Sequence, residues 1–142
     1  MRNAVEFQNV YKSLGSKKVF RDFNLAIPAG VITSIVGESG SGKTTLLSLI
    51  NGVGFADSGS ISVFGQVITR ENLLQTQRGI GYAVQGAGLF PHLTAEENIS
   101  LPLEINYHSN SEKLTQKWLE SVDLVQRAKQ YPGQLSGGEQ QR

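Results

Sequence analysis

Apolar and polar residues alternate over the first part of the chain in the way expected of β-strands. Residues 4–10 (AVEFQNV) predict a first strand. A turn at residues 14–17 (LGSK) separates it from a second alternating stretch, from Val19 to Ile27. Short apolar runs at residues 61–64 and 80–85 predict two more strands. The chain up to about residue 85 is therefore predicted to be rich in strands.

The run from Val31 to Val36 (VITSIV) differs from these stretches because it carries no charge and is rich in β-branched residues. Such a run is typical of a strand that is buried on both faces of a sheet. It is preceded by Pro28-Ala29-Gly30 and followed by a glycine-rich loop. We therefore expect a buried central strand here, then a helix from Thr44 to Ile50 that ends at Asn51-Gly52.

After residue 85 the pattern becomes helical. Residues 86–91 (GAGLFP) predict a loop. Thr94, with Glu97 three residues later, is typical of a capping box at the start of a helix. Pro102 should break or bend that helix, because proline lacks the backbone N–H that the helix needs.

A further helix is predicted from Ser111 to Val122. Leu114, Trp118 and Val122 recur at helical spacing, and Leu119 widens the apolar stripe. We expect Trp118 to be a core aromatic residue of this helical part.

Composition limits the classes of protein to consider. Of the 142 residues, 39% are apolar and 18% charged, as in an ordinary globular chain, and the net charge of +1 does not indicate nucleic-acid binding. The chain has no cysteine, which excludes disulfides and thiolate metal sites and is consistent with a reducing compartment. The N-terminus lacks the apolar stretch of a secretory signal, and no apolar run approaches the roughly 20 residues of a membrane helix. We expect a soluble, cytoplasmic protein.

Residues 37–44 read GESGSGKT and match the phosphate-binding pattern G-x-x-x-x-G-K-[ST]. Its glycines let the backbone N–H groups approach crowded anionic oxygens, and the loop leads into a helix N-terminus that favours negative charge. Lys43 is predicted to contact the β- and γ-phosphates, and Thr44 to offer its hydroxyl to Mg²⁺. The predicted nucleotide-binding residues are Gly37, Glu38, Ser39, Gly40, Ser41, Gly42, Lys43, Thr44 and Thr45.

A second motif closes the chain. Residues 135–142 read LSGGEQQR, and Gln85 ends the stretch IGYAVQ ahead of LFPHLTAEENI. Together with the phosphate loop, these segments resemble the signature and the Q-loop of the ATP-binding-cassette (ABC) ATPases. The resemblance extends from the first strand to the last residue.

The resemblance implies an α/β fold: a P-loop NTPase core with an antiparallel β-subdomain and an α-helical subdomain. Residues 1–85 would form the nucleotide-binding core, residues 86–134 the helical subdomain, and residues 135–142 the signature. The C-terminal part of the core, with the Mg²⁺-binding Asp, the catalytic Glu and the switch His of the family, is expected to lie outside the chain. We therefore expect no complete set of catalytic residues and no ATP turnover by these 142 residues alone.

The resemblance also implies roles for single residues. Gln85 would reach Mg²⁺ or the attacking water, as an auxiliary catalytic residue beside the metal ligand Thr44. Ser136, Gly137 and Gly138 form a turn with little Cβ bulk, ahead of a helix that should begin near Glu139. The N-terminus of such a helix favours a bound anion. In the family, this turn faces the γ-phosphate held by another subunit, so that ATP lies between two subunits arranged head to tail.

The implied function is that of the ATP-binding, and in full-length form ATP-hydrolysing, subunit of an ABC transporter. The cofactors would be ATP and Mg²⁺, and the partners a second ATPase subunit and the membrane subunits at the inner face of the cell membrane. The LFPHLTAEENI segment resembles that of importers of amino acids, osmolytes or sugars. Two alternatives stay open: a truncated fragment that binds nucleotide or a partner without hydrolysis, and a soluble ABC protein without a transport role.

One position departs from the family pattern. Leu14 stands where the family usually has an aromatic residue that stacks on adenine. Tyr11 is nearby, but three residues along an extended segment place it on the opposite face. We expect weak stacking of the base, or apolar contact from Leu14 and Val19 instead.

Overall fold

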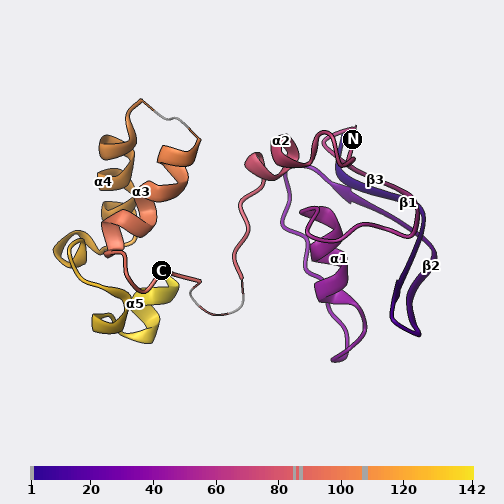
Figure 1. Ribbon diagram of the computed structural model, residues 1–142, viewed down its shortest axis with the longest axis horizontal. Helices are drawn as coiled ribbons and strands as arrows, with labels where there is room; N and C mark the ends of the chain where they lie inside the picture. The colour runs from indigo at the N-terminus through magenta and orange to yellow at the C-terminus, as the bar shows by residue number, and fades with distance from the viewer. Residues whose placement is uncertain (1, 85, 87, 107–108) are drawn as a thin grey trace. The chain divides into compact units, whose positions relative to one another are not determined.

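The computed structural model of the protein describes residues 2–84, 86, 88–106 and 109–142. The chain divides into two compact units, residues 1–82 and 83–142 (Figure 1). The first contains a sheet and two helices, and the described part of the second consists of helices and loops. The expected boundaries at residues 85 and 134 stay a prediction.

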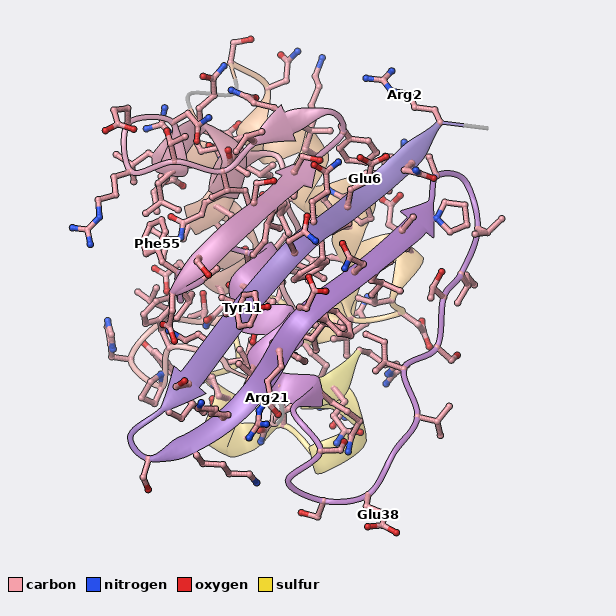
Figure 2. The ribbon with its side chains drawn as sticks, turned by 90° about the vertical axis from the view of Figure 1, so that its right-hand side faces the viewer. Arg2, Glu6, Tyr11, Arg21, Glu38 and Phe55 are labelled. Carbon is pink, nitrogen blue, oxygen red and sulfur yellow. The ribbon has the colours of Figure 1, made fainter. Side chains whose placement is uncertain are left out.

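The first unit is built on a four-stranded antiparallel sheet with the order β2-β1-β3-β4 (Figures 1 and 2). The three strands predicted from residues 4–10, 19–27 and 61–64 are confirmed, and β1 and β2 are longer than predicted. The short β4 carried no signal of its own in the sequence. The strands are β1 (Asn3–Leu14), β2 (Lys17–Pro28), β3 (Ser58–Val63) and β4 (Gln66–Val67).

One face of the sheet is covered by helix α1 (Lys43–Ile50), which begins and ends within one residue of its predicted bounds. The core consists of apolar side chains from β1, β3 and α1, with Phe7 and Leu49 almost completely buried. Alternate residues of β1 point away from this core. Figure 2 shows Glu6 and Tyr11 on that outer face.

The expected central strand at residues 31–36 is not formed. The segment is a loop, and Ile32 and Val36 are 98% and 92% exposed. Figure 2 shows this loop running outside the sheet as far as Glu38. A strand is stabilised by hydrogen bonds to a neighbouring strand, and no described segment of the chain pairs with this one. The prediction was wrong because an apolar β-branched run favours a strand but does not by itself supply the neighbouring strand that it must pair with.

The predicted strand at residues 80–85 is not formed either, as far as the structure describes it. Residues 80–84 are without regular structure, and Gln85 lies outside the described residues. Ile80 packs against the core of the first unit, so this run still contributes an apolar side chain to that core. A short helix that the sequence did not predict, α2 (Leu73–Arg78), precedes it.

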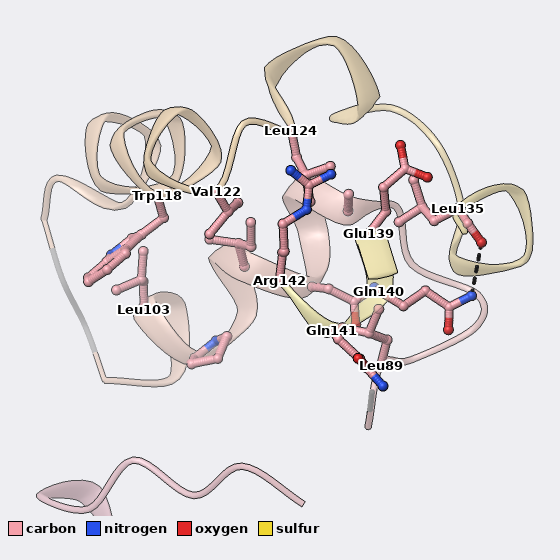
Figure 3. Close-up of a pocket in the computed structure, with 14 residues that line it drawn as sticks. Leu89, Leu103, Trp118, Val122, Leu124, Leu135, Glu139, Gln140, Gln141 and Arg142 are labelled. Carbon is pink, nitrogen blue, oxygen red and sulfur yellow. Dashed lines mark hydrogen bonds between the residues drawn. The ribbon is translucent and has the colours of Figure 1, made fainter. Parts of the chain in front are cut away.

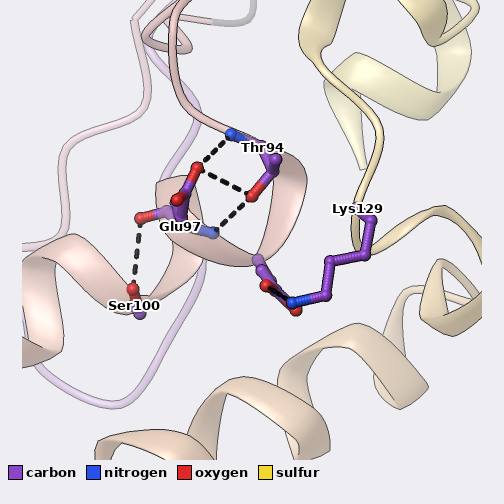
Figure 4. Close-up of polar contacts among 5 residues, drawn as sticks. Thr94, Glu97, Ser100 and Lys129 are labelled. Carbon is purple, nitrogen blue, oxygen red and sulfur yellow. Dashed lines mark hydrogen bonds and ion pairs between the residues drawn. The ribbon is translucent and has the colours of Figure 1, made fainter.

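In the second unit, α3 (Ala95–Ile105) begins with the predicted capping box (Figure 4). The Thr94 N–H donates to Glu97 Oε2 over 2.7 Å, and the Glu97 N–H donates to Thr94 Oγ1 over 3.3 Å. Lys129 forms an ion pair with Glu96 in the same turn. Of the break or bend expected at Pro102, the break is absent, since α3 continues to Ile105, and the bend stays a prediction.

Helix α4 (Ser111–Ser121) confirms the second predicted helix, but its buried face differs from the expected one. Thr115 and Leu119 are buried, whereas Trp118 is 54% exposed and is not a core residue. Because Thr115 carries a polar hydroxyl, the hydrophobic pattern did not identify it as the centre of the buried face. The remaining elements are η1 (Val125–Arg127), η2 (Pro132–Gln134) and α5 (Gly137–Gln141).

Candidate functional site

The predicted phosphate loop leads directly into α1. Gly40 and Gly42 have φ angles of +78° and +102°, a region that side chains with a Cβ rarely adopt. The Ser41 N–H donates to the Glu38 carbonyl over 3.2 Å, which closes a tight turn inside the loop. The loop is therefore a concave run of backbone that depends on glycine.

Lys43, the first residue of α1, folds back over this loop. Its ammonium group donates to the carbonyl oxygens of Gly37, over 2.8 Å, and of Glu38, over 2.7 Å. The positive charge is thus held at the mouth of the turn, where the sequence motif predicts it.

The N-terminus of α1 supplies further donors to the same place. The first hydrogen bond of the helix runs from the Leu46 N–H to the Gly42 carbonyl over 2.8 Å. The N–H groups of Lys43, Thr44 and Thr45 precede that bond, as the first N–H groups of any helix do, and face the loop. Backbone N–H groups and a lysine ammonium are the donor set that suits phosphate oxygens.

A hollow of about 390 Å³ joins the loop to the end of the β1–β2 hairpin. The sequence motif predicted the loop side of this hollow, but not Lys17, which comes from the hairpin and has no motif of its own. The lining residues are Leu14, Lys17, Val19, Ser39, Gly40, Gly42, Lys43, Thr44 and Thr45.

The hairpin side of the hollow has an apolar part beside the charged Lys17. Leu14 and Val19 line it, as expected for an apolar contact with a base. Tyr11 lies on the outer face of the sheet (Figure 2), away from α1. The structure therefore places Leu14, and not Tyr11, beside the phosphate loop.

The predicted metal ligands are only partly described. Thr44 lies in the first turn of α1 and lines the hollow. Gln85 lies outside the described residues, so its predicted role stays a prediction. Over residues 2–84, 86, 88–106 and 109–142, no cluster of three or more His, Asp or Glu side chains is arranged to hold a metal ion.

The second motif forms a capped turn at the start of α5. Ser136 is the N-cap residue: its N–H donates to Glu139 Oε2 over 2.7 Å, and its Oγ accepts from the Glu139 N–H over 3.3 Å. Hydrogen bonding to its carboxylate by the Ser136 side chain, and then by the Ser136 N–H, lowers the pKa of Glu139, which also pairs with Arg127 over 3.3 Å. The helix begins two residues earlier than predicted, at Gly137.

Gly137 and Gly138 are not required by the packing of the described chain. Neither has a positive φ, and nothing lies within 4 Å of a Cβ built on either residue. The turn thus presents a bare stretch of backbone to its surroundings.

The second unit contains a separate hollow of about 450 Å³ between α3, α4 and α5 (Figure 3). Trp118, Val122 and Leu103 form much of its wall, and Gln140 at one side donates to the Leu135 carbonyl over 3.1 Å. This hollow is mainly apolar and has no glycine-rich cradle among its lining residues. It therefore does not share the phosphate-binding chemistry of the loop.

Comparison with known proteins identifies the family. Residues 20–142 match the family described as ABC transporter. The chain belongs to this family, as the two motifs predicted. No helix in the described part of this ABC chain is long and apolar enough to span a membrane.

Two relatives of this ABC chain show the range of similarity. The Fe(3+) ions import ATP-binding protein FbpC of Pseudomonas fluorescens is 42% identical over 146 residues, which cover 99% of this chain and 40% of FbpC. The spermidine/putrescine import ATP-binding protein PotA of Haemophilus influenzae is 42% identical over 141 residues, or 97% of this chain and 37% of PotA. The chain thus spans about two fifths of the length of these relatives.

A solved structure confirms the predicted fold class. The dimeric, post-hydrolysis state of the ATP-binding cassette MJ0796, bound to ADP and Pi, superimposes with a TM-score of 0.83 at 32% identity. The alignment covers 96% of this chain and 65% of that one.

Proposed function

We propose that this chain is the nucleotide-binding portion of the ATP-binding subunit of an ABC importer. The observation that supports this most directly is the position of Lys43, whose ammonium lies over a glycine-dependent loop at a helix N-terminus. That arrangement concentrates positive charge and N–H donors on one small concave surface. The import ATP-binding proteins FbpC and PotA add support for the transporter class.

ATP fits the residues that line the hollow. Phosphate oxygens would replace the carbonyls of Gly37 and Glu38 as acceptors for the Lys43 ammonium, because an anionic oxygen is a stronger acceptor than a neutral one. The N–H groups of the loop and of the first turn of α1 would bind the remaining oxygens. Leu14 and Val19 would offer the base an apolar surface.

Mg²⁺ is the second proposed cofactor. The Thr44 hydroxyl lies in the first turn of α1, where the phosphate-loop motif places a Mg²⁺ ligand. Gln85 is proposed as a further ligand from the motif alone. Bound ATP–Mg²⁺ would supply the phosphoryl group for transfer to water, a reaction that depends mainly on positioning and charge neutralisation.

We further propose that Ser136, Gly137 and Gly138 complete the nucleotide site of a second ATPase subunit. Two glycines that no internal contact requires leave room for a ligand to approach the backbone from outside. The dimeric cassette MJ0796 supports such an arrangement. The membrane subunits of an importer would be the other partners, which would place the protein at the inner face of the cell membrane.

Calorimetric titration of the 142-residue protein with ATP–Mg²⁺ tests the central claim. We expect measurable binding that Lys43→Ala abolishes, because the charge that faces the phosphates is removed. Lys18→Ala, which removes an equal charge from an exposed position on β2, should bind as the unaltered protein does. Equal affinity in the Lys43→Ala protein would refute the assignment of the loop as the nucleotide site.

A further inference from the structure

A second lysine lies at the phosphate loop. Lys17, the first residue of β2, donates from its ammonium to the Gly40 carbonyl over 3.0 Å. Gly40 belongs to the glycine-rich turn and lies at a different part of the loop from Gly37 and Glu38, which accept from Lys43. The loop therefore has a lysine ammonium on each of two separate stretches of its backbone.

The hairpin holds Lys17 in this place. Leu14 and Lys17 are directly opposite each other in the β1–β2 register and close the turn formed by Gly15 and Ser16. Cross-strand partners of this kind point to the same face of the sheet, and both side chains line the hollow.

Asp57 anchors β1 close to the turn of the same hairpin. Its carboxylate accepts from the Ser13 N–H over 2.7 Å and pairs with the Lys12 ammonium over 3.2 Å. The charge of Lys12 is thereby compensated. Within the described part of the chain, the Lys17 ammonium donates only to the neutral Gly40 carbonyl, so its charge is not compensated in the same way.

We propose that Lys17 is a nucleotide-contacting residue that binds the phosphate chain of ATP at its nucleoside end. An anionic phosphate oxygen would replace the neutral Gly40 carbonyl as the acceptor, because charge-assisted hydrogen bonds are the stronger ones. The nucleoside end is favoured because Lys17 shares its turn with Leu14, the residue proposed to contact the base. This inference rests on the proposed function of the loop.

Two nucleotides distinguish the roles of the two lysines. Lys43, at the β- and γ-phosphates, should affect ATP more than ADP. Lys17, at the nucleoside end, should affect both alike. We expect Lys17→Gln to weaken ATP and ADP binding by the same factor, about three- to fivefold, which is the size of a partly solvated ion pair.

The experiment is calorimetric titration of the 142-residue protein with ATP–Mg²⁺ and ADP–Mg²⁺. Lys18→Gln is the matched control, because it removes the same charge one residue away and from the other face of β2. It should bind both nucleotides unchanged, and Lys17→Arg should retain most of the affinity. Thermal unfolding of each variant shows whether the fold is intact.

Each outcome decides between the claims. Unchanged binding by Lys17→Gln, or an equal loss in Lys18→Gln, would overturn the role of Lys17 while Lys43→Ala still supports the loop. A loss confined to ATP would overturn the placement at the nucleoside end. Absence of binding by the unaltered protein would overturn both this inference and the proposed function.

Discussion

Gly42 lies directly against Val19: a Cβ on Gly42 would stand 2.8 Å from Val19 Cγ1. Gly42 also has a φ of +102°, so the backbone and the packing both demand glycine at the last position before α1. The contact joins the phosphate loop to the hairpin that forms the other wall of the hollow. The absence of a Cβ at Gly42 thus lets the loop and the hairpin approach each other this closely.

Gly42→Ala should therefore lower both stability and nucleotide affinity. We expect a loss of about 1–2 kcal/mol in the free energy of unfolding from the backbone conformation, and a further loss from the contact with Val19. Urea unfolding measures the loss of stability, and calorimetry measures the loss of nucleotide affinity. Gly81→Ala is the control, because Gly81 has no atom within 4 Å of a built Cβ and no positive φ.

A double variant separates the two causes. Adding Val19→Ala to Gly42→Ala should recover the part of the loss that comes from the contact, but not the part that comes from φ. Full recovery of stability would show that the φ angle contributes nothing, and no recovery would show that the contact contributes nothing.

Gly137→Ala should have the opposite effect on stability. Gly137 lies in the first turn of α5 with open space around it, and alanine is favoured over glycine in a helix by up to about 1 kcal/mol. We expect urea unfolding to show equal or higher stability, and calorimetry to show unchanged ATP binding at the chain's own loop. ATP-dependent self-association, measured by sedimentation, should decrease. Unimpaired association would argue against a role for this turn at a partner's nucleotide.

Thr94→Ala should destabilise the second unit by about 1 kcal/mol, since it removes the N-cap hydroxyl of α3. Chemical unfolding followed by the fluorescence of Trp118, which lies in the same unit, measures the loss. Thr94→Ser keeps the hydroxyl and should retain most of the stability. An equal loss in both variants would mean that the methyl group, and not the cap, is responsible.

The partner of this cap makes the second unit sensitive to acid. The Thr94 N–H, and then its hydroxyl, lower the pKa of Glu97. A lowered folded-state pKa stabilises the protein above the ordinary glutamate value of about 4.3, and this contribution is lost as the pH falls through the lowered pKa. Glu97→Gln should therefore flatten the pH dependence of unfolding in this range. Glu112→Gln, at an exposed position in the first turn of α4, is the matched control for the loss of a glutamate charge.

Base selectivity should be loose, because Leu14 offers an apolar contact without a stacking ring. We expect ATP to bind no more than about tenfold tighter than GTP, a difference of about 1.4 kcal/mol. Leu14→Trp should raise the affinity for both nucleotides through stacking on the base. Strong preference for ATP in the unaltered protein would show that another residue recognises adenine.

The sequence by itself determined the features that depend on neighbouring residues. Three such features are the capping box of Thr94 and Glu97, the turn at Gly15 and the left-handed glycines of the phosphate loop. Each depends on backbone angles and hydrogen bonds among residues that lie within a few positions of one another. Their residue types therefore predict their geometry, and the two motifs predicted the family. The same reasoning predicted α1 and α4 to within one residue at each end.

Only the tertiary structure decided the features that need a distant partner. The run from Val31 to Val36 has the composition of a buried strand, but a strand forms only where another supplies its hydrogen bonds, and no described segment does so. Trp118 follows the apolar stripe of its helix, yet the packing of α4 on its neighbours buries Thr115 and Leu119 instead. Lys17 reaches the loop because a hairpin folds it next to Gly40, 23 positions away in the chain. Packing between distant segments, which local pattern does not encode, is the reason for all three.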